Sequence, residues 1–171
     1  MDFYQGVVTE FLRADRALFV NTECCIQINE GANPDTSGPH WYCDAVVADF
    51  KDKRVYLCEI SYAAPPKDLV SRLASWNTHW TKLCAALRRD CQLLPDWPIS
   101  PWLFVPSHVR SKLEAAVEKI GSRAGEAREM PAPRVTILED VQPWMYRYWS
   151  RDHIGLDVAK LGVSVPITAS T

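Results

Sequence analysis

Two strand-like runs joined by a short connection constrain the fold of this chain more than any other feature. The runs cover residues 40–49 and 54–62, and the connection between them is Phe50-Lys51-Asp52-Lys53. Both runs are rich in valine, tyrosine and cysteine, and a four-residue connection is short enough for neighbouring antiparallel strands. We therefore predict a β-hairpin whose loop is centred between Lys51 and Asp52.

This hairpin places two carboxylates opposite each other, because the predicted register pairs Asp44 with Glu59. Opposed residues point to the same face of a sheet, with Cβ atoms about 4.5–5.5 Å apart. Both carboxylates lie within apolar runs, and two buried like charges raise each other's pKa. A positive group is therefore expected beside them, either a Lys or Arg side chain or a hard cation such as Mg²⁺.

Other roles for these carboxylates stay open at this point. A strand carboxylate can lie on a solvated face or form an ion pair with arginine. An inward charge on an edge strand can also prevent edge-to-edge aggregation. The residue pattern does not choose between these structural roles and a metal site.

The rest of the chain predicts helices and strands in alternation. Before the hairpin we expect a helix over residues 2–14, a strand over 17–28 and a loop over 29–40. Pro65 and Pro66 begin a predicted long helix. Its continuous apolar stripe consists of Leu69, Leu73, Trp76, Trp80, Leu83 and Leu87. Further on we expect a strand over 102–105, a helix over 107–121, a strand over 134–138 and a short aromatic helix over 143–149.

The resulting order, α-β-β-β-α-β-α-β, predicts the α/β class with a mixed (α+β) sheet and helices on both faces. The length of 171 residues is typical of one domain. We therefore expect a single domain over 1–171, in which residues 106–171 are a C-terminal elaboration of the core.

Composition narrows the classes of protein. The formal net charge is −2, so overall electrostatics do not favour a nucleic-acid partner, although a local basic groove stays possible. None of the six cysteines forms a C-x-x-C pair, so buried thiols are expected rather than a zinc site. The chain has no basic leader and no apolar run of membrane-spanning length. We expect a cytoplasmic protein.

With these residues in place, residues 2–105 resemble the PD-(D/E)XK restriction-endonuclease-like superfamily, whose core is also written α-β-β-β-α-β. The matching positions are Asp44, preceded by Cys43 rather than proline, and Glu59 in the run Glu59-Ile60-Ser61. The resemblance implies that Asp44 and Glu59 bind Mg²⁺ (or Mn²⁺). It also implies a third acidic ligand on the first helix, for which Glu10 is the candidate.

The chain departs from this superfamily at one catalytic position, because Ser61 occupies the place of the motif lysine. A serine hydroxyl cannot replace the positive charge that lysine supplies at the phosphate. Some superfamily members carry the basic group on the following helix. Arg72, His79 and Lys67 are the candidates for that role here.

The resemblance implies a Mg²⁺-dependent nuclease, a hydrolase of phosphodiester bonds that binds DNA or another nucleic acid. The absent lysine favours an alternative, a catalytically inactive nuclease-like fold that serves as a binding or protein-interaction module. A third possibility is a structural subunit that forms a homo-oligomer or binds a protein partner through its C-terminal aromatic residues. These residues, which could also stack nucleobases, are Trp144, Tyr146, Tyr148 and Trp149.

Overall fold

The structure, a computed structural model, describes residues 2–28, 40–91, 96–122 and 129–143. Its elements are α1 (Phe3–Ala14), β1 (Leu18–Gln27), β2 (His40–Asp49), β3 (Arg54–Ile60), α2 (Lys67–Thr78), α3 (Trp80–Cys91), β4 (Ile99–Val105), α4 (Ser107–Ser122), β5 (Arg134–Ile137) and a final 3₁₀ turn, η1 (Leu138–Asp140). The predicted loop over 29–40 and the predicted aromatic helix over 143–149 lie almost entirely outside the described residues.

Five strands form one mixed sheet in the order β1-β2-β3-β4-β5. The β1–β2 and β2–β3 pairs are antiparallel, whereas the β3–β4 and β4–β5 pairs are parallel. The predicted hairpin register is confirmed, because Ala45 pairs with Cys58 and Asp49 pairs with Arg54. The Asp49 carboxylate also accepts hydrogen bonds from the backbone N–H groups of Lys51 and Asp52, at 3.0 Å each.

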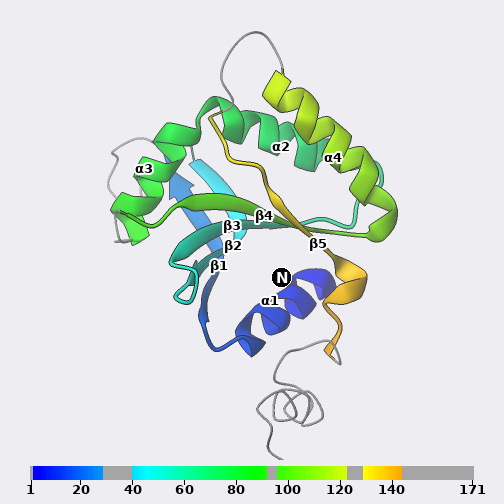
Figure 1. The fold of residues 1–171 in the computed structure, drawn as a ribbon, viewed down its shortest axis with the longest axis horizontal. Coiled ribbons are helices and arrows are strands. Elements are labelled where there is room, and N and C mark those ends of the chain that lie inside the picture. Colours follow the sequence, from blue (N-terminus) through cyan, green and yellow to red (C-terminus); the bar gives the residue numbers. More distant parts are fainter. Residues whose placement is uncertain (1, 29–39, 92–95, 123–128, 144–171) are drawn as a thin grey trace, which may run out of the picture.

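Helices cover both faces of the sheet, as predicted. Figure 1 shows α1 on one face and α2, α3 and α4 on the other. Two apolar clusters follow this division: one joins α1 to the sheet, and the other joins the sheet to the three later helices. The fold is therefore a mixed α/β arrangement with a five-stranded sheet and, among the described residues, four α-helices. None of these helices is long and apolar enough to cross a membrane.

The predicted long helix is wrong in one respect, because the structure breaks it at His79 into α2 and α3. The run Trp76-Asn77-Thr78-His79 contains only weak helix formers. The Asn77 side chain also accepts a hydrogen bond from the backbone N–H of Met130, at 3.3 Å. These local features account for the end of α2.

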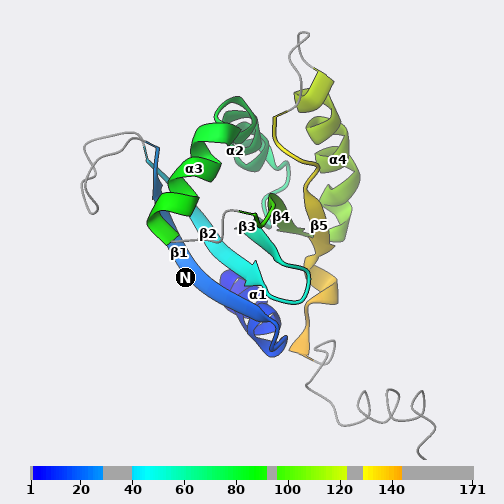
Figure 2. The same cartoon turned by 60° about the vertical axis from the view of Figure 1, so that its left-hand side comes forward.

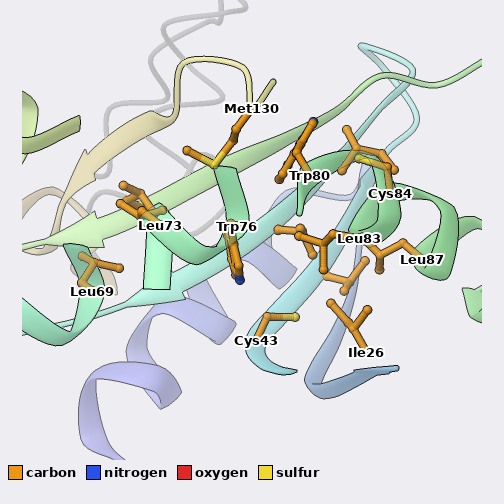
Figure 3. Packing of buried hydrophobic residues seen from close by; sticks show 14 of the residues in the cluster. Ile26, Cys43, Leu69, Leu73, Trp76, Trp80, Leu83, Cys84, Leu87 and Met130 are labelled. Carbon is orange, nitrogen blue, oxygen red and sulfur yellow. The ribbon is translucent and has the colours of Figure 1, made fainter. Parts of the chain in front are cut away.

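The break lets the two helices pack in different places without losing the apolar stripe. α2 packs against α4, and α3 packs over β1 (Figure 2). Figure 3 shows side chains of both helices directed toward Ile26 of β1 and Cys43 of β2. All six predicted stripe residues, from Leu69 to Leu87, are buried.

A second irregularity lies in the β1–β2 pair, at the level of Glu23 and Asp44. The flanking pairs are Thr22 with Ala45 and Cys24 with Cys43, and Glu23 between them has a positive φ of 54°. Side-chain alternation changes phase at this point. On one side of it, Val20, Ala45 and Val47 pack toward α1, and on the other, Cys24, Ile26 and Cys43 pack toward α3.

The centre of the sheet provides a stability test at Leu103 of β4. This side chain is fully buried and its residue pairs with Glu59 of β3. We expect Leu103→Ala to lower the free energy of unfolding by about 2–5 kcal/mol, since it leaves a cavity in a packed interior. Urea denaturation measures the change. Phe19→Ala, at an exposed position of β1, is the control and should change stability far less; equal losses would contradict the described core.

Candidate functional site

The predicted carboxylate pair lies where β2 and β3 leave their ladder. Ala45 and Cys58 are the last ladder pair, and Asp44 and Glu59 follow them on the two strands. Glu59 belongs to the central strand, between β2 and β4, and only 3% of its surface is exposed. The hairpin therefore brings the two carboxylates together from residues fifteen positions apart in the chain.

Asp44 joins three elements through its two carboxylate oxygens. Its Oδ1 accepts a hydrogen bond from the side-chain amide of Gln5 on α1, at 2.7 Å. Its Oδ2 accepts one from the backbone N–H of Ile60 on β3, also at 2.7 Å. Both distances are typical of strong hydrogen bonds to a carboxylate. The side chain of Asp44 thus occupies a position where a strand carbonyl would otherwise receive the β3 N–H.

Gln5 is a site residue that the sequence analysis missed. It forms a capping box with Asp2: the Asp2 carboxylate accepts from the backbone N–H of Gln5 at 2.8 Å, and the side-chain Oε1 of Gln5 accepts from the backbone N–H of Asp2 at 2.9 Å. These bonds leave the Gln5 amide nitrogen directed at Asp44. The spacing Asp-x-x-Gln at the start of a helix is the signal that could have identified it.

Glu59 makes its polar contact on the opposite face, with Arg72 of α2. The Arg72 guanidinium forms an ion pair with Oε2 of Glu59. The contacts of the two carboxylates therefore run in opposite directions, Asp44 toward α1 and Glu59 toward α2, rather than into one shared face as the simple hairpin predicted. The change of phase near Glu23 accounts for this difference.

The charge of Glu59 is only partly compensated. Burial, and then the negative charge of Asp44, raise the pKa of Glu59 to about 8, although Arg72 acts in the opposite direction. Its second oxygen, Oε1, is buried and has no hydrogen-bond partner among the described residues. A buried acceptor without a partner costs free energy comparable to a lost hydrogen bond. This atom is the least satisfied part of the site.

The structure places the other predicted site residues elsewhere. Glu10 is 65% exposed and forms a surface ion pair with Arg13, at 3.3 Å. The ring of His79 lies against that of Trp41, with ring centroids 5.5 Å apart. Lys67 lines a pocket of about 700 Å³ between α2 and α4. Of the three basic candidates, Arg72 is the one that contacts the carboxylate pair.

Ser61 continues the backbone pairing of β3 with β4, because its N–H donates to the carbonyl oxygen of Phe104 at 3.0 Å. Ser61 thus lies directly after the central strand, at the position where the resemblance would place a lysine. The positive charge at the pair comes from α2 instead, through Arg72. The aromatic residues Trp144, Tyr146, Tyr148 and Trp149 lie outside the described residues.

The donor set fits a hard divalent cation. Asp44 and Glu59 supply carboxylate oxygens, and Oε1 of Glu59 is a buried acceptor that a cation could satisfy. Mg²⁺ is commonly held by one or two carboxylates together with water and substrate oxygens. Within the described ranges, no cluster of three or more His, Cys, Asp or Glu side chains forms a complete protein cage for a metal. A cation bound to Oε1 of Glu59 would therefore take its remaining ligands from Asp44, water or substrate.

The chain matches no protein-family model, and no curated protein matches its sequence. The geometry of the carboxylate pair is therefore the basis for the functional proposal below.

The raised pKa of Glu59 predicts a pH-dependent stability. The folded protein keeps a proton on Glu59 up to about pH 8, whereas an ordinary glutamate, as in the unfolded chain, loses it near pH 4.5. Stability contributed by this group is therefore complete below about pH 4.5 and is lost as the pH rises toward 8. The slope cannot exceed about 1.4 kcal/mol per pH unit for one proton.

The variant Glu59→Gln, which resembles the protonated side chain, should remove this dependence. We expect its melting temperature to match the wild type near pH 5 and to exceed it increasingly up to pH 8.5. Differential scanning fluorimetry across this range measures the difference. Parallel curves for the two proteins would show that Glu59 titrates normally.

Proposed function

We propose that this chain is a Mg²⁺-dependent nuclease, a phosphodiesterase of nucleic acid, whose site consists of Asp44, Glu59 and Arg72. The observation that carries the proposal is Oε1 of Glu59, which is buried beside a second carboxylate and has no hydrogen-bond partner in the described part of the chain. When ionised, the two carboxylates carry two negative charges, and Arg72 supplies one positive charge. A divalent cation would supply the missing positive charge and would also be the partner that Oε1 lacks. The element order α-β-β-β, then helix and strand, also agrees with the one that the PD-(D/E)XK resemblance implies, except that the helix is divided into α2 and α3.

The protein's own residues divide the work. Asp44 and Glu59 hold the cation, and Gln5 and the Ile60 N–H fix the orientation of Asp44. When bound, the cation supplies Lewis-acid polarisation of a phosphodiester and a nucleophilic water at neutral pH. The Arg72 side chain is 42% exposed, so it can contact a phosphate oxygen while it remains beside Glu59. A guanidinium suits this task because its fork of N–H donors matches phosphate oxygens.

A second candidate is an inactive nuclease-like module that binds a partner without cleavage. The ion pair between Arg72 and Glu59 favours this candidate, because one oxygen of the carboxylate that would bind a cation is already bonded to an arginine. Ser61 in place of the motif lysine points in the same direction. In this case Arg72 has a structural role, and divalent metals neither stabilise the protein nor support cleavage.

Substitution of Asp44 separates the two candidates. If the proposal is correct, millimolar Mg²⁺ or Mn²⁺ raises the melting temperature of the wild type and supports cleavage of a labelled oligonucleotide. Binding to the folded state contributes about 2.7 kcal/mol at a hundredfold excess over the dissociation constant. Asp44→Asn should abolish both effects. The matched control Asp68→Asn alters an exposed acid on α2 and should abolish neither. A wild type that shows neither metal effect supports the inactive module.

The role of Arg72 is tested by a pair of variants. We expect Arg72→Ala to reduce metal-dependent cleavage about a hundredfold, the size of effect seen when one donor to a developing negative charge is removed. Because Arg72 lowers the pKa of Glu59, its loss should also move the rising limb of the pH–rate profile to higher pH. Arg72→Lys should restore that limb and part of the rate. An Arg72→Ala rate equal to wild type would exclude arginine as the replacement for the motif lysine.

A further inference from the structure

Three exposed aromatic side chains gather where α1 begins and β3 ends, the elements that carry Gln5 and Glu59. The rings of Tyr4 on α1 and Tyr62 after β3 stack on each other, with centroids 4.7 Å apart and an interplanar angle of 28°. Phe3 packs its ring against Tyr4 in an edge arrangement, at 5.4 Å. The exposed fractions are 75% for Phe3, 38% for Tyr4 and 54% for Tyr62. Because α1 buries Val8 and Leu12 instead, the aromatic residues at its start do not belong to the core.

The two tyrosines are tied to the site by their chain neighbours. Tyr4 directly precedes Gln5, whose amide is bonded to Asp44. Tyr62 follows Ser61, three residues after Glu59 on the same strand end. The same hydrogen bond that fixes Asp44 therefore also fixes the start of α1, where Tyr4 meets Tyr62. The two rings therefore lie at the ends of the elements that carry Gln5 and Glu59.

We propose that Tyr4 and Tyr62 form a stacking platform for an unpaired nucleobase, so that the substrate is single-stranded nucleic acid. This inference rests on the proposed nuclease function. Every base offers a flat face to an aromatic side chain, and stacking of this kind binds single strands with little regard to sequence. In a duplex the base faces are stacked within the helix and cannot reach such a platform without being flipped out.

The charge of the chain supports the same substrate class. Tight binding to duplex DNA depends on many lysine and arginine contacts to phosphates. The formal net charge here is −2, and the side chains described around the site are two carboxylates, one arginine and several aromatic rings. This surface can therefore bind a base by stacking, but its described residues include too few basic side chains to neutralise many phosphates.

The chain provides a matched control in a second exposed aromatic pair. Phe19 and Phe50 lie at the opposite end of the hairpin from Asp44, with ring centroids 4.9 Å apart, and are 62% and 54% exposed. They resemble the Tyr4–Tyr62 pair in exposure and contact but are distant in sequence and register from the carboxylates. A general effect of removing an exposed ring will therefore appear in both pairs.

The test measures binding of the full chain to fluorescein-labelled oligonucleotides by anisotropy, in EDTA so that metal-dependent cleavage is suppressed. We expect the wild type to bind a 20-nucleotide thymidine single strand more tightly than a 20-base-pair duplex. Tyr62→Ala should weaken single-strand binding about tenfold, within the range found when alanine replaces a base-stacking residue. Tyr62→Phe should bind like the wild type, because it keeps the ring. Phe19→Ala should also bind like the wild type.

Separate outcomes decide the inference and the proposed function. Preference for the duplex, absence of binding to either probe, or equal effects of Tyr62→Ala and Phe19→Ala would overturn the platform. If one of these outcomes overturned the platform, cleavage by the wild type in Mg²⁺ would still support the nuclease function. Conversely, the expected binding pattern without cleavage under Mg²⁺ or Mn²⁺ would establish the platform on an inactive module.

Discussion

A buried carboxylate in the middle of the sheet is the constraint on which this end of the molecule depends. Glu59 lies on the central strand and is almost entirely removed from water, and an ionised carboxylate in such a place needs a compensating charge. Arg72 supplies a positive charge beside Glu59, but the negative charge of Asp44 acts against the ionised form of Glu59. A proton on Glu59, the guanidinium and a cation are alternative partners for the same buried charge. The position of α2, which brings Arg72 over β3, is therefore part of the chemistry of the site.

Asp44 has the complementary task of holding the surroundings in place. Its two oxygens bond to Gln5 of α1 and to the backbone of β3, so that one side chain connects a helix on one face of the sheet to the strand carrying Glu59. The positive φ of Glu23 and the change of side-chain phase in β1 and β2 occur at the same level. Because of that change, Asp44 contacts the same face as its neighbour Ala45, the face covered by α1, whereas Cys43 packs on the opposite face. The irregularity near Glu23 thus turns Asp44 away from the apolar core beneath α3.

The parts of this arrangement that follow from local rules were predictable from sequence, and the parts that depend on tertiary contacts were not. The register that pairs β2 with β3 followed from an even loop, and the stripe from Leu69 to Leu87 followed from helical spacing. The break at His79 did not, because no proline or glycine marks it and an Asn77 contact from the distant Met130 contributes to it. Gln5 was readable from its capping box with Asp2, but its bond to Asp44 joins residues on separate elements. The exposure of Tyr4 at the start of α1 was not predictable, because periodicity alone cannot show which turn of a helix packs on the sheet.

The geometry of Arg72 bears on whether the pair is a structural device or a site. A purely structural arginine partner is best placed when it is enclosed and bonds both oxygens of the carboxylate, since burying a charge is stabilising only with complete pairing. Here the guanidinium bonds one oxygen and stays 42% exposed, and Oε1 of Glu59 is buried with no partner among the residues that the structure describes. A hydrophobic residue of similar size would remove this unsatisfied charge at no loss of packing. The arrangement is therefore incomplete as a stabilising interaction, and this is the reason to regard the pair as a candidate site rather than only as a structural ion pair.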